Sequence, residues 1–161
     1  MSVAFRRESD EEHKEPRFEL PIPAGPNLVT VRGLQMITDR LHSIECALAG
    51  AADEPAREAL KREKRYWNTR QTTAVLAPIP SADVVAFGSR VGIRLNGMPR
   101  TIDIVGSDEA DPAAGRIAFT APLARSLIGA FEGEIWAFGG NEQAIEILSI
   151  DVIPRVENDR P

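Results

Sequence analysis

The sequence predicts an α+β protein in which an antiparallel helical hairpin, a short coiled coil, precedes a small antiparallel sheet domain with one short helix. Apolar residues between positions 34 and 48 recur at alternating spacings of three and four, which is typical of a helix that packs on a partner helix. Two prolines, Pro78 and Pro80, interrupt the helical pattern. Beyond them the apolar period becomes two, which indicates strands.

The first 28 residues are expected to form a flexible, charged tail, or one that becomes ordered only by lying along the body. Four prolines interrupt this stretch, at positions 16, 21, 23 and 26, and its apolar residues are few. Such a segment buries too little apolar surface to offset the entropy lost on ordering. The hydrophobic content of the whole chain, 43 %, still predicts a real core further on.

The first helix of the hairpin is expected to start after Thr30, a suitable N-cap residue, and to end at Gly50. Its apolar stripe consists of Leu34, Ile37, Leu41, Ile44 and Leu48. A turn at residues 50–54 would bring a second helix back against this stripe.

Asp53 and Glu54 followed by Pro55 form an N-cap and first-turn signature for the second helix. This helix is expected over residues 55–76, with Leu60, Trp67 and Ala74 spaced by seven. The hairpin as a whole occupies residues 29–77, and about 19 residues at about 1.5 Å each give an arm of roughly 28 Å.

The second helix carries a concentration of positive charge. Residues 55–70 have a net charge of +4 in a chain whose net charge is −5. Two interpretations stay open: a solvated helix face, or a surface that binds nucleic-acid phosphates or an acidic protein channel. The basic residues are Arg57, Lys61, Arg62, Lys64, Arg65 and Arg70, and the neighbouring Tyr66 and Trp67 could stack on bases, although Trp67 lies in the core stripe.

The sheet domain is expected over residues 84–156, after a linker at 78–83 and before a short tail at 157–161. Strands at 89–95 and 100–106 flank Asn96-Gly97, a strong signal for a hairpin turn. A third strand is expected at 116–120, a short helix at 121–129, and two further strands at 132–138 and 144–153. Five antiparallel strands and one helix make a small α+β domain.

An acidic loop containing Asp108, Glu109 and Asp111 follows the second strand. It does not have the ligand spacing of an EF-hand loop, because the glycine and glutamate positions hold Ala113 and Phe119. A short loop between strands also lacks the concave site that an acid pair needs for catalysis. Three interpretations of these carboxylates remain: they lie in a solvated turn, they cap local backbone amides, or they form a surface used by a partner.

The run from the acidic loop to the last strand resembles the C-terminal domain of Gre-type transcription elongation factors (GreA/GreB) and of the related regulator of nucleoside diphosphate kinase. The matching elements are Gly106 with the acidic loop, Gly115, Pro122-Leu123, Leu127-Ile128-Gly129, Gly133-Glu134 and Ile147–Ile150. Residues 27–41, NLVTVRGLQMITDRL, are similar to the opening of the first coiled-coil helix of the family. The resemblance therefore covers residues 27–153.

This resemblance implies an FKBP-like C-terminal domain that grips the rim of the secondary channel of bacterial RNA polymerase, and a coiled-coil finger that enters the channel. It implies that the polymerase-binding surface includes Asp108, Glu109, Asp111, Pro122 and Leu123. Contacts with the channel, or with RNA or DNA inside the transcription complex, would come from Arg57, Lys61, Arg62, Lys64 and Arg65 on the basic helix.

The hairpin tip differs from that of family members that stimulate transcript cleavage. Those members have a longer finger and an acidic tip motif that helps to hold a catalytic magnesium of the polymerase. Here the tip reads AGAADEPA, and only Asp53 and Glu54 could help to hold the magnesium of the polymerase.

The leading functional hypothesis is therefore a non-enzymatic factor that binds RNA polymerase and modulates elongation, without a cofactor or metal of its own. A monomer is expected, because the hairpin satisfies its own apolar stripe. The alternatives are stimulation of transcript cleavage through the tip acids and regulation of a protein partner outside transcription. A single cysteine, Cys46, excludes an internal disulfide, and the absence of a signal or membrane-spanning segment predicts a cytoplasmic protein with no membrane partner.

Overall fold

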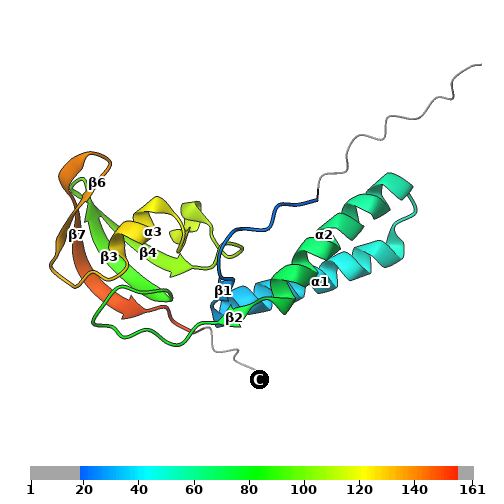
Figure 1. Ribbon diagram of the computed structural model, residues 1–161, viewed down its shortest axis with the longest axis horizontal. Helices are drawn as coiled ribbons and strands as arrows, with labels where there is room; N and C mark the ends of the chain where they lie inside the picture. Colours follow the sequence, from blue (N-terminus) through cyan, green and yellow to red (C-terminus); the bar gives the residue numbers. More distant parts are fainter. Residues whose placement is uncertain (1–18, 156–161) are drawn as a thin grey trace, which may run out of the picture.

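The computed structural model describes residues 19–155 and shows a helical hairpin that projects away from a sheet domain (Figure 1). The predicted fold class is confirmed. The predicted tail at 157–161 and the first 18 residues of the N-terminal tail lie outside the described residues.

The hairpin consists of α1 (Val31–Gly50) and α2 (Glu54–Thr72), which run antiparallel side by side (Figure 1). Thr30 caps α1 by accepting a hydrogen bond from the amide of Gly33 at 2.9 Å, and Asp53 caps α2 by accepting one from Ala56 at 3.2 Å. Both predicted N-caps are thus confirmed. The centre of the apolar stripe is buried, at Ile37, Leu41 and Ile44, which is the tertiary packing that stabilises a short hairpin.

The second helix is shorter than the sequence predicted, because it ends at Thr72 instead of continuing to residue 76. Residues Val75–Leu76 leave the helix and form strand β2, which pairs in parallel with strand β1 (Leu28–Val29). The amide of Val75 donates to the carbonyl of Asn27 at 2.9 Å. Backbone pairing to a segment 47 positions earlier replaces the last helical turn, an interaction that a local pattern does not reveal.

The N-terminal boundary of the folded body lies earlier than position 29. Asn27 is buried, and its side-chain amide donates to the carbonyl of Arg70 at 2.7 Å and to the hydroxyl of Thr73 at 3.1 Å. Residues 27 and 28, assigned to the tail from the sequence, therefore belong to the body. These two residues connect the start of α1 to the end of α2.

The main sheet has five strands in the order β5-β4-β3-β7-β6. These are β3 (Ser89–Leu95), β4 (Met98–Val105), β5 (Arg116–Ala118), β6 (Ile135–Phe138) and β7 (Asn141–Val152). The turn between β3 and β4 has positive φ angles at Asn96 and Gly97, 48° and 83°, as the Asn-Gly signal predicts.

The sheet differs from the expected all-antiparallel arrangement at one edge, where β5 pairs with β4 in parallel. The chain leaves the end of β4, crosses the acidic loop and a 3₁₀ turn (Pro112–Ala114), and re-enters the sheet beside Asp103. The loop is long enough to reverse the chain twice, so β5 takes the direction of β4. The short helix α3 (Pro122–Leu127) follows β5 and packs its buried Ala124 and Leu127 into the core.

Candidate functional site

The acidic loop lies at the joint between the helical hairpin and the sheet domain. Asp108 accepts hydrogen bonds from the hydroxyl of Tyr66 and from Nε of Arg70, each at 2.5 Å. Tyr66 and Arg70 are four residues apart, so both lie on the same face of α2. The side chains of Arg70 and Asp108 are only 4 % and 10 % exposed. This buried pair fixes the base of the hairpin to the sheet domain.

Glu109 makes the second polar contact across the joint. Its carboxylate accepts a hydrogen bond from the hydroxyl of Thr30 at 2.5 Å, and Nη1 of Arg32 lies 4.0 Å away. Thr30 is the N-cap of α1, so the same hydroxyl caps the helix and anchors it to the loop.

The prediction that Asp108 and Glu109 form a partner-facing surface therefore needs a correction. The Glu109 side chain is 3 % exposed, and both carboxylates are directed at the hairpin. Their charges are used within the molecule because each meets a donor on α1 or α2. The alternative of a solvated turn is excluded for these two residues by the same contacts.

The remaining residues predicted for that surface are accessible in part. Asp111 has a side chain that is 48 % exposed and is paired with Arg116 at 3.1 Å. Pro122 is exposed at the start of α3, and Leu123 is half-buried against the core.

The joint is also packed closely at the backbone level. A Cβ atom on Gly106 would lie 2.5 Å from the carbonyl oxygen of Leu28 in β1, and one on Gly33 would lie 2.8 Å from a carboxylate oxygen of Glu109. The neighbour of Gly106 is backbone, which cannot give way as the end of the Glu109 side chain can, so Gly106 is the glycine that sets the distance between hairpin and sheet domain.

Replacing Gly106 with alanine is expected to lower the free energy of unfolding by about 1–3 kcal/mol, because the added methyl group forces β1 away from the loop. Thermal or denaturant unfolding measures this change. Gly50→Ala is the matched control, since nothing lies within 4 Å of its added Cβ and alanine has a higher helix propensity than glycine at this last residue of α1. Equal stability of the two variants would contradict close packing at the joint.

The pKa of the Tyr66 phenol depends on whether the contacts at the joint are formed. Burial is the main cause that raises the pKa of its phenol from 10.0 to about 12, and the hydrogen bond to Asp108 and the charge of that carboxylate add to it. The sequence contains one tyrosine, so the ultraviolet absorbance of tyrosinate reads this group alone.

We expect the midpoint of tyrosinate formation near 12 in the folded protein and near 10 in denaturant. Since the unfolded state releases the proton first, stability falls as the pH rises from 10 to 12. Asp108→Asn should lower the midpoint without abolishing the shift. A folded-state midpoint equal to that in denaturant would contradict the contact.

The basic face of α2 is largely engaged in ion pairs. Lys64 pairs with Glu45 of α1 at 3.0 Å, Lys61 with Glu58 at 2.9 Å, and Arg65 with Glu19 at 2.6 Å. Arg57 donates to the carbonyl of Ala51 at the hairpin turn. All of these groups are at least partly exposed, and exposed pairs exchange readily for other partners.

Two residues of the predicted basic set behave differently. Arg70 is not part of the basic face, because its side chain is buried and pairs with Asp108. Arg62 stays on α2 close enough to Glu19 for its charge to help lower the pKa of that carboxyl, after the larger effects of Arg65.

At the tip of the hairpin, Asp53 and Glu54 are both exposed. Asp53 is occupied by capping α2. Within residues 19–155, no group of three or more histidine, cysteine, aspartate or glutamate side chains could hold a metal ion. In the same range, no helix is long and apolar enough to span a bilayer.

Four large apolar side chains on the segment from the end of α3 to β6 are exposed, which the sequence did not predict. We refer to this segment as the α3–β6 surface; its exposed residues are Ile128, Phe131, Ile135 and Trp136, with exposed fractions of 40, 53, 58 and 38 %. Glu134 accepts hydrogen bonds from the Phe131 amide at 2.9 Å and from the Trp136 indole at 3.3 Å, and these bonds hold this loop at the surface.

Comparison with known proteins shows what the sheet domain is similar to. Residues 80–152 match the family model described as "Transcription elongation factor, GreA/GreB, C-term". Transcription elongation factor GreB of Neisseria meningitidis is 43 % identical over 100 residues, which cover 58 % of this chain and 61 % of the relative. GreA of Vibrio cholerae is 52 % identical over 90 residues, covering 53 % and 57 %. The chain thus spans about three fifths of the length of these relatives.

Two further similarities cover a larger share of the chain. GreA of Ralstonia nicotianae is 25 % identical over 150 residues, covering 76 % of this chain and 95 % of the relative. The solved structure of GreA factor homolog 1 of Thermus thermophilus aligns over 79 % of this chain with a TM-score of 0.38 and 18 % identity. The family model and the curated relatives thus agree that residues 80–152 of this chain are similar to the C-terminal domain of GreA/GreB transcription elongation factors.

Proposed function

We propose that this protein binds bacterial RNA polymerase at its secondary channel and modulates transcription elongation without a catalytic site of its own. The observation that carries the proposal is the similarity of residues 80–152 to the GreA/GreB C-terminal domain, in a chain that joins them to an antiparallel two-helix finger. The named relatives are transcription elongation factors.

The architecture supports separate roles for the sheet domain and the helical finger. The sheet domain presents the exposed apolar residues of the α3–β6 surface, which follow Pro122 and Leu123 of α3 in the chain. We expect these residues to bind a partner protein, because exposed apolar patches mark protein-binding sites. The finger projects away from that domain (Figure 1), and 20 residues of α1 at about 1.5 Å each give it a length of about 30 Å. Docking of the domain would leave the finger free to enter a channel.

The basic face of α2 suits the interior of a polymerase channel. Its exposed ion pairs contribute little to stability, so Lys61, Lys64 and Arg65 can turn from their glutamate partners to acidic or phosphate groups. Contacts with RNA or DNA would then be electrostatic and sensitive to salt.

A second candidate function is stimulation of transcript cleavage by the polymerase, favoured by the exposed carboxylates of Asp53 and Glu54 at the finger tip. Against it, Asp53 is used as a helix cap, and the tip carries only these two acids. Regulation of a partner outside transcription, suggested by the resemblance to the nucleoside diphosphate kinase regulator, stays a prediction.

A purified polymerase stalled in a backtracked complex separates these functions. We expect the protein to bind the complex without shortening the transcript. The decisive variant is Asp53→Ser with Glu54→Gln, which removes both carboxylates and keeps an N-cap hydroxyl, so that α2 stays folded. Cleavage that disappears in this variant would establish the second candidate, whereas failure to bind the polymerase at all would overturn the proposed function.

A further inference from the structure

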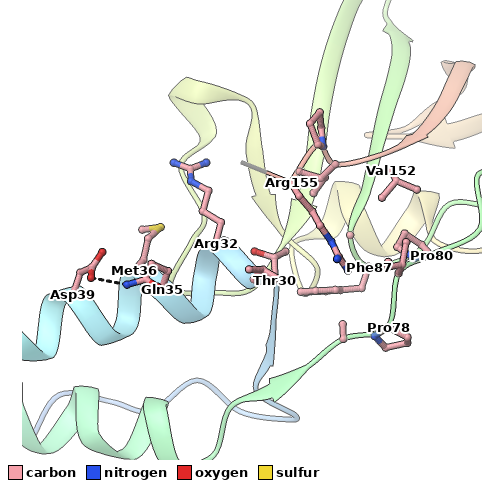
Figure 2. A pocket seen from close by; sticks show the side chains of 16 residues that line it. Thr30, Arg32, Gln35, Met36, Asp39, Pro78, Pro80, Phe87, Val152 and Arg155 are labelled. Carbon is pink, nitrogen blue, oxygen red and sulfur yellow. Dashed lines mark hydrogen bonds between the residues drawn. The ribbon is translucent and has the colours of Figure 1, made fainter. Parts of the chain in front are cut away.

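A groove of about 400 Å³ lies where the hairpin meets the sheet domain (Figure 2), and no residue of the acidic loop lines it. Four separate segments line it: the first turns of α1, residues 77–80, residues 87–88 and residues 152–155. We call it the joint groove. Its volume falls within the range of binding clefts, about 300–1,000 Å³.

The walls of the joint groove are apolar and accessible. Val31 and Met36 on α1 are 53 % and 39 % exposed, Ile79 of the linker is 61 % exposed, and Val152 at the end of β7 is 37 % exposed. These four side chains come from three segments that are distant in sequence and converge on one hollow. A gathering of large apolar side chains at a concave surface indicates a binding site.

Two guanidinium groups give the groove its charge. The Arg155 side chain extends over the hollow beside Phe87 in Figure 2, and within residues 19–155 it has no ion-pair partner. Arg32 on the facing wall is 45 % exposed, and its nearest carboxylate is Glu109 at 4.0 Å. The acid of the groove, Asp39, accepts a hydrogen bond from Gln35 at 2.8 Å. The groove therefore complements an apolar ligand that also carries negative charge.

The size of the groove limits the ligand to a short stretch of chain. One turn of a helix about 10 Å across and 5.4 Å long fills roughly 400 Å³. A few residues with one or two apolar side chains fit this space, and an adjoining carboxylate would reach Arg155 or Arg32.

We infer that the joint groove holds a short segment of the RNA polymerase in which an apolar side chain stands next to a carboxylate. This inference rests on the proposed function and deepens it. The polymerase would then be held at two places, the α3–β6 surface and the joint groove. Because the groove has walls from both α1 and the sheet domain, its occupant would also hold the finger at a fixed angle during entry into the channel.

Site-specific photocrosslinking to purified RNA polymerase tests the inference. A photoreactive benzoylphenylalanine is placed at position 36 in the joint groove, at position 135 in the α3–β6 surface, or at position 98, the exposed first residue of β4, as a control. We expect crosslinks to the polymerase from positions 36 and 135 and none from position 98. The peptide crosslinked from position 36 should contain an aspartate or glutamate beside an apolar residue.

Affinity measurements accompany the crosslinking. Arg155→Glu should weaken polymerase binding about tenfold at low salt, whereas Arg155→Lys should retain most of the affinity. Arg100→Glu, on the exposed β4 strand away from the groove, is the matched charge-reversal control and should bind like the parent protein.

The outcomes distinguish this inference from the proposed function. Crosslinking from position 135 without crosslinking from position 36 would overturn the joint groove as a polymerase site and leave polymerase binding in place. A crosslink from position 36 to residues of the same chain, or to a second copy, would also overturn it by naming another occupant. Failure of both positions, with no detectable complex, would overturn the groove inference together with the proposed function.

Discussion

Arg70→Met is expected to lower the free energy of unfolding by about 3–5 kcal/mol, one of the largest effects of any single substitution in this protein. Removal of the guanidinium leaves the carboxylate of Asp108 with a single donor, the Tyr66 hydroxyl, in a site where it is 10 % exposed. A buried charge that loses its partner is strongly destabilising, because neither water nor a counter-ion replaces it. Chemical denaturation monitored by circular dichroism gives the value directly.

Two comparisons make the Arg70 result specific. Arg90→Met removes a similar pair with Asp103, but Arg90 is 39 % exposed, so a loss below about 1 kcal/mol is expected. The double variant Arg70→Met with Asp108→Leu should recover much of the stability, since no charge is then left unpaired. If Arg70→Met and Arg90→Met cost the same, the joint would not depend on a buried ion pair.

The second large effect is expected at the α3–β6 surface. Phe131→Ser combined with Ile135→Ser should weaken binding to RNA polymerase at least about 30-fold, because large apolar side chains near the centre of an interface carry most of the binding energy. Both side chains are more than half exposed, so the fold should keep its stability. Equilibrium binding to purified polymerase, with thermal unfolding measured in parallel, separates the two properties.

Val75→Ser is the matched control for this pair of substitutions. Val75 is 54 % exposed, like the two target residues, but it lies on β2 at the joint. It should leave polymerase affinity unchanged. An unchanged affinity in the Phe131/Ile135 variant would remove the α3–β6 surface from the interface and would direct attention to Asp111 and Pro122.

Local features of the chain were sufficient to predict the hairpin and most of the strands. Thr30 and Asp53 act as caps because their side-chain oxygens reach amides only three residues away. The buried stripe of α1 follows from apolar spacing within one helix, and the β3–β4 turn follows from two adjacent residues with positive φ. The similarity of the sheet domain to the C-terminal domain of GreA/GreB factors was also readable from short motifs, since each of them is contiguous in sequence.

The roles of the charged residues were decided by the tertiary structure. From the sequence, Arg70 looked like part of a basic helix face, and Asp108 and Glu109 looked like surface acids. A pattern of charges along the chain does not indicate which charged residues pair in the fold. Arg70 meets Asp108 across 38 positions, and Thr30 meets Glu109 across 79. The same is true of β2, which became a strand through pairing with β1, and of the joint groove, which needs four segments of the chain. Sequence periodicity reports how a segment folds on itself, whereas burial and ion pairing depend on which distant segments the fold brings together.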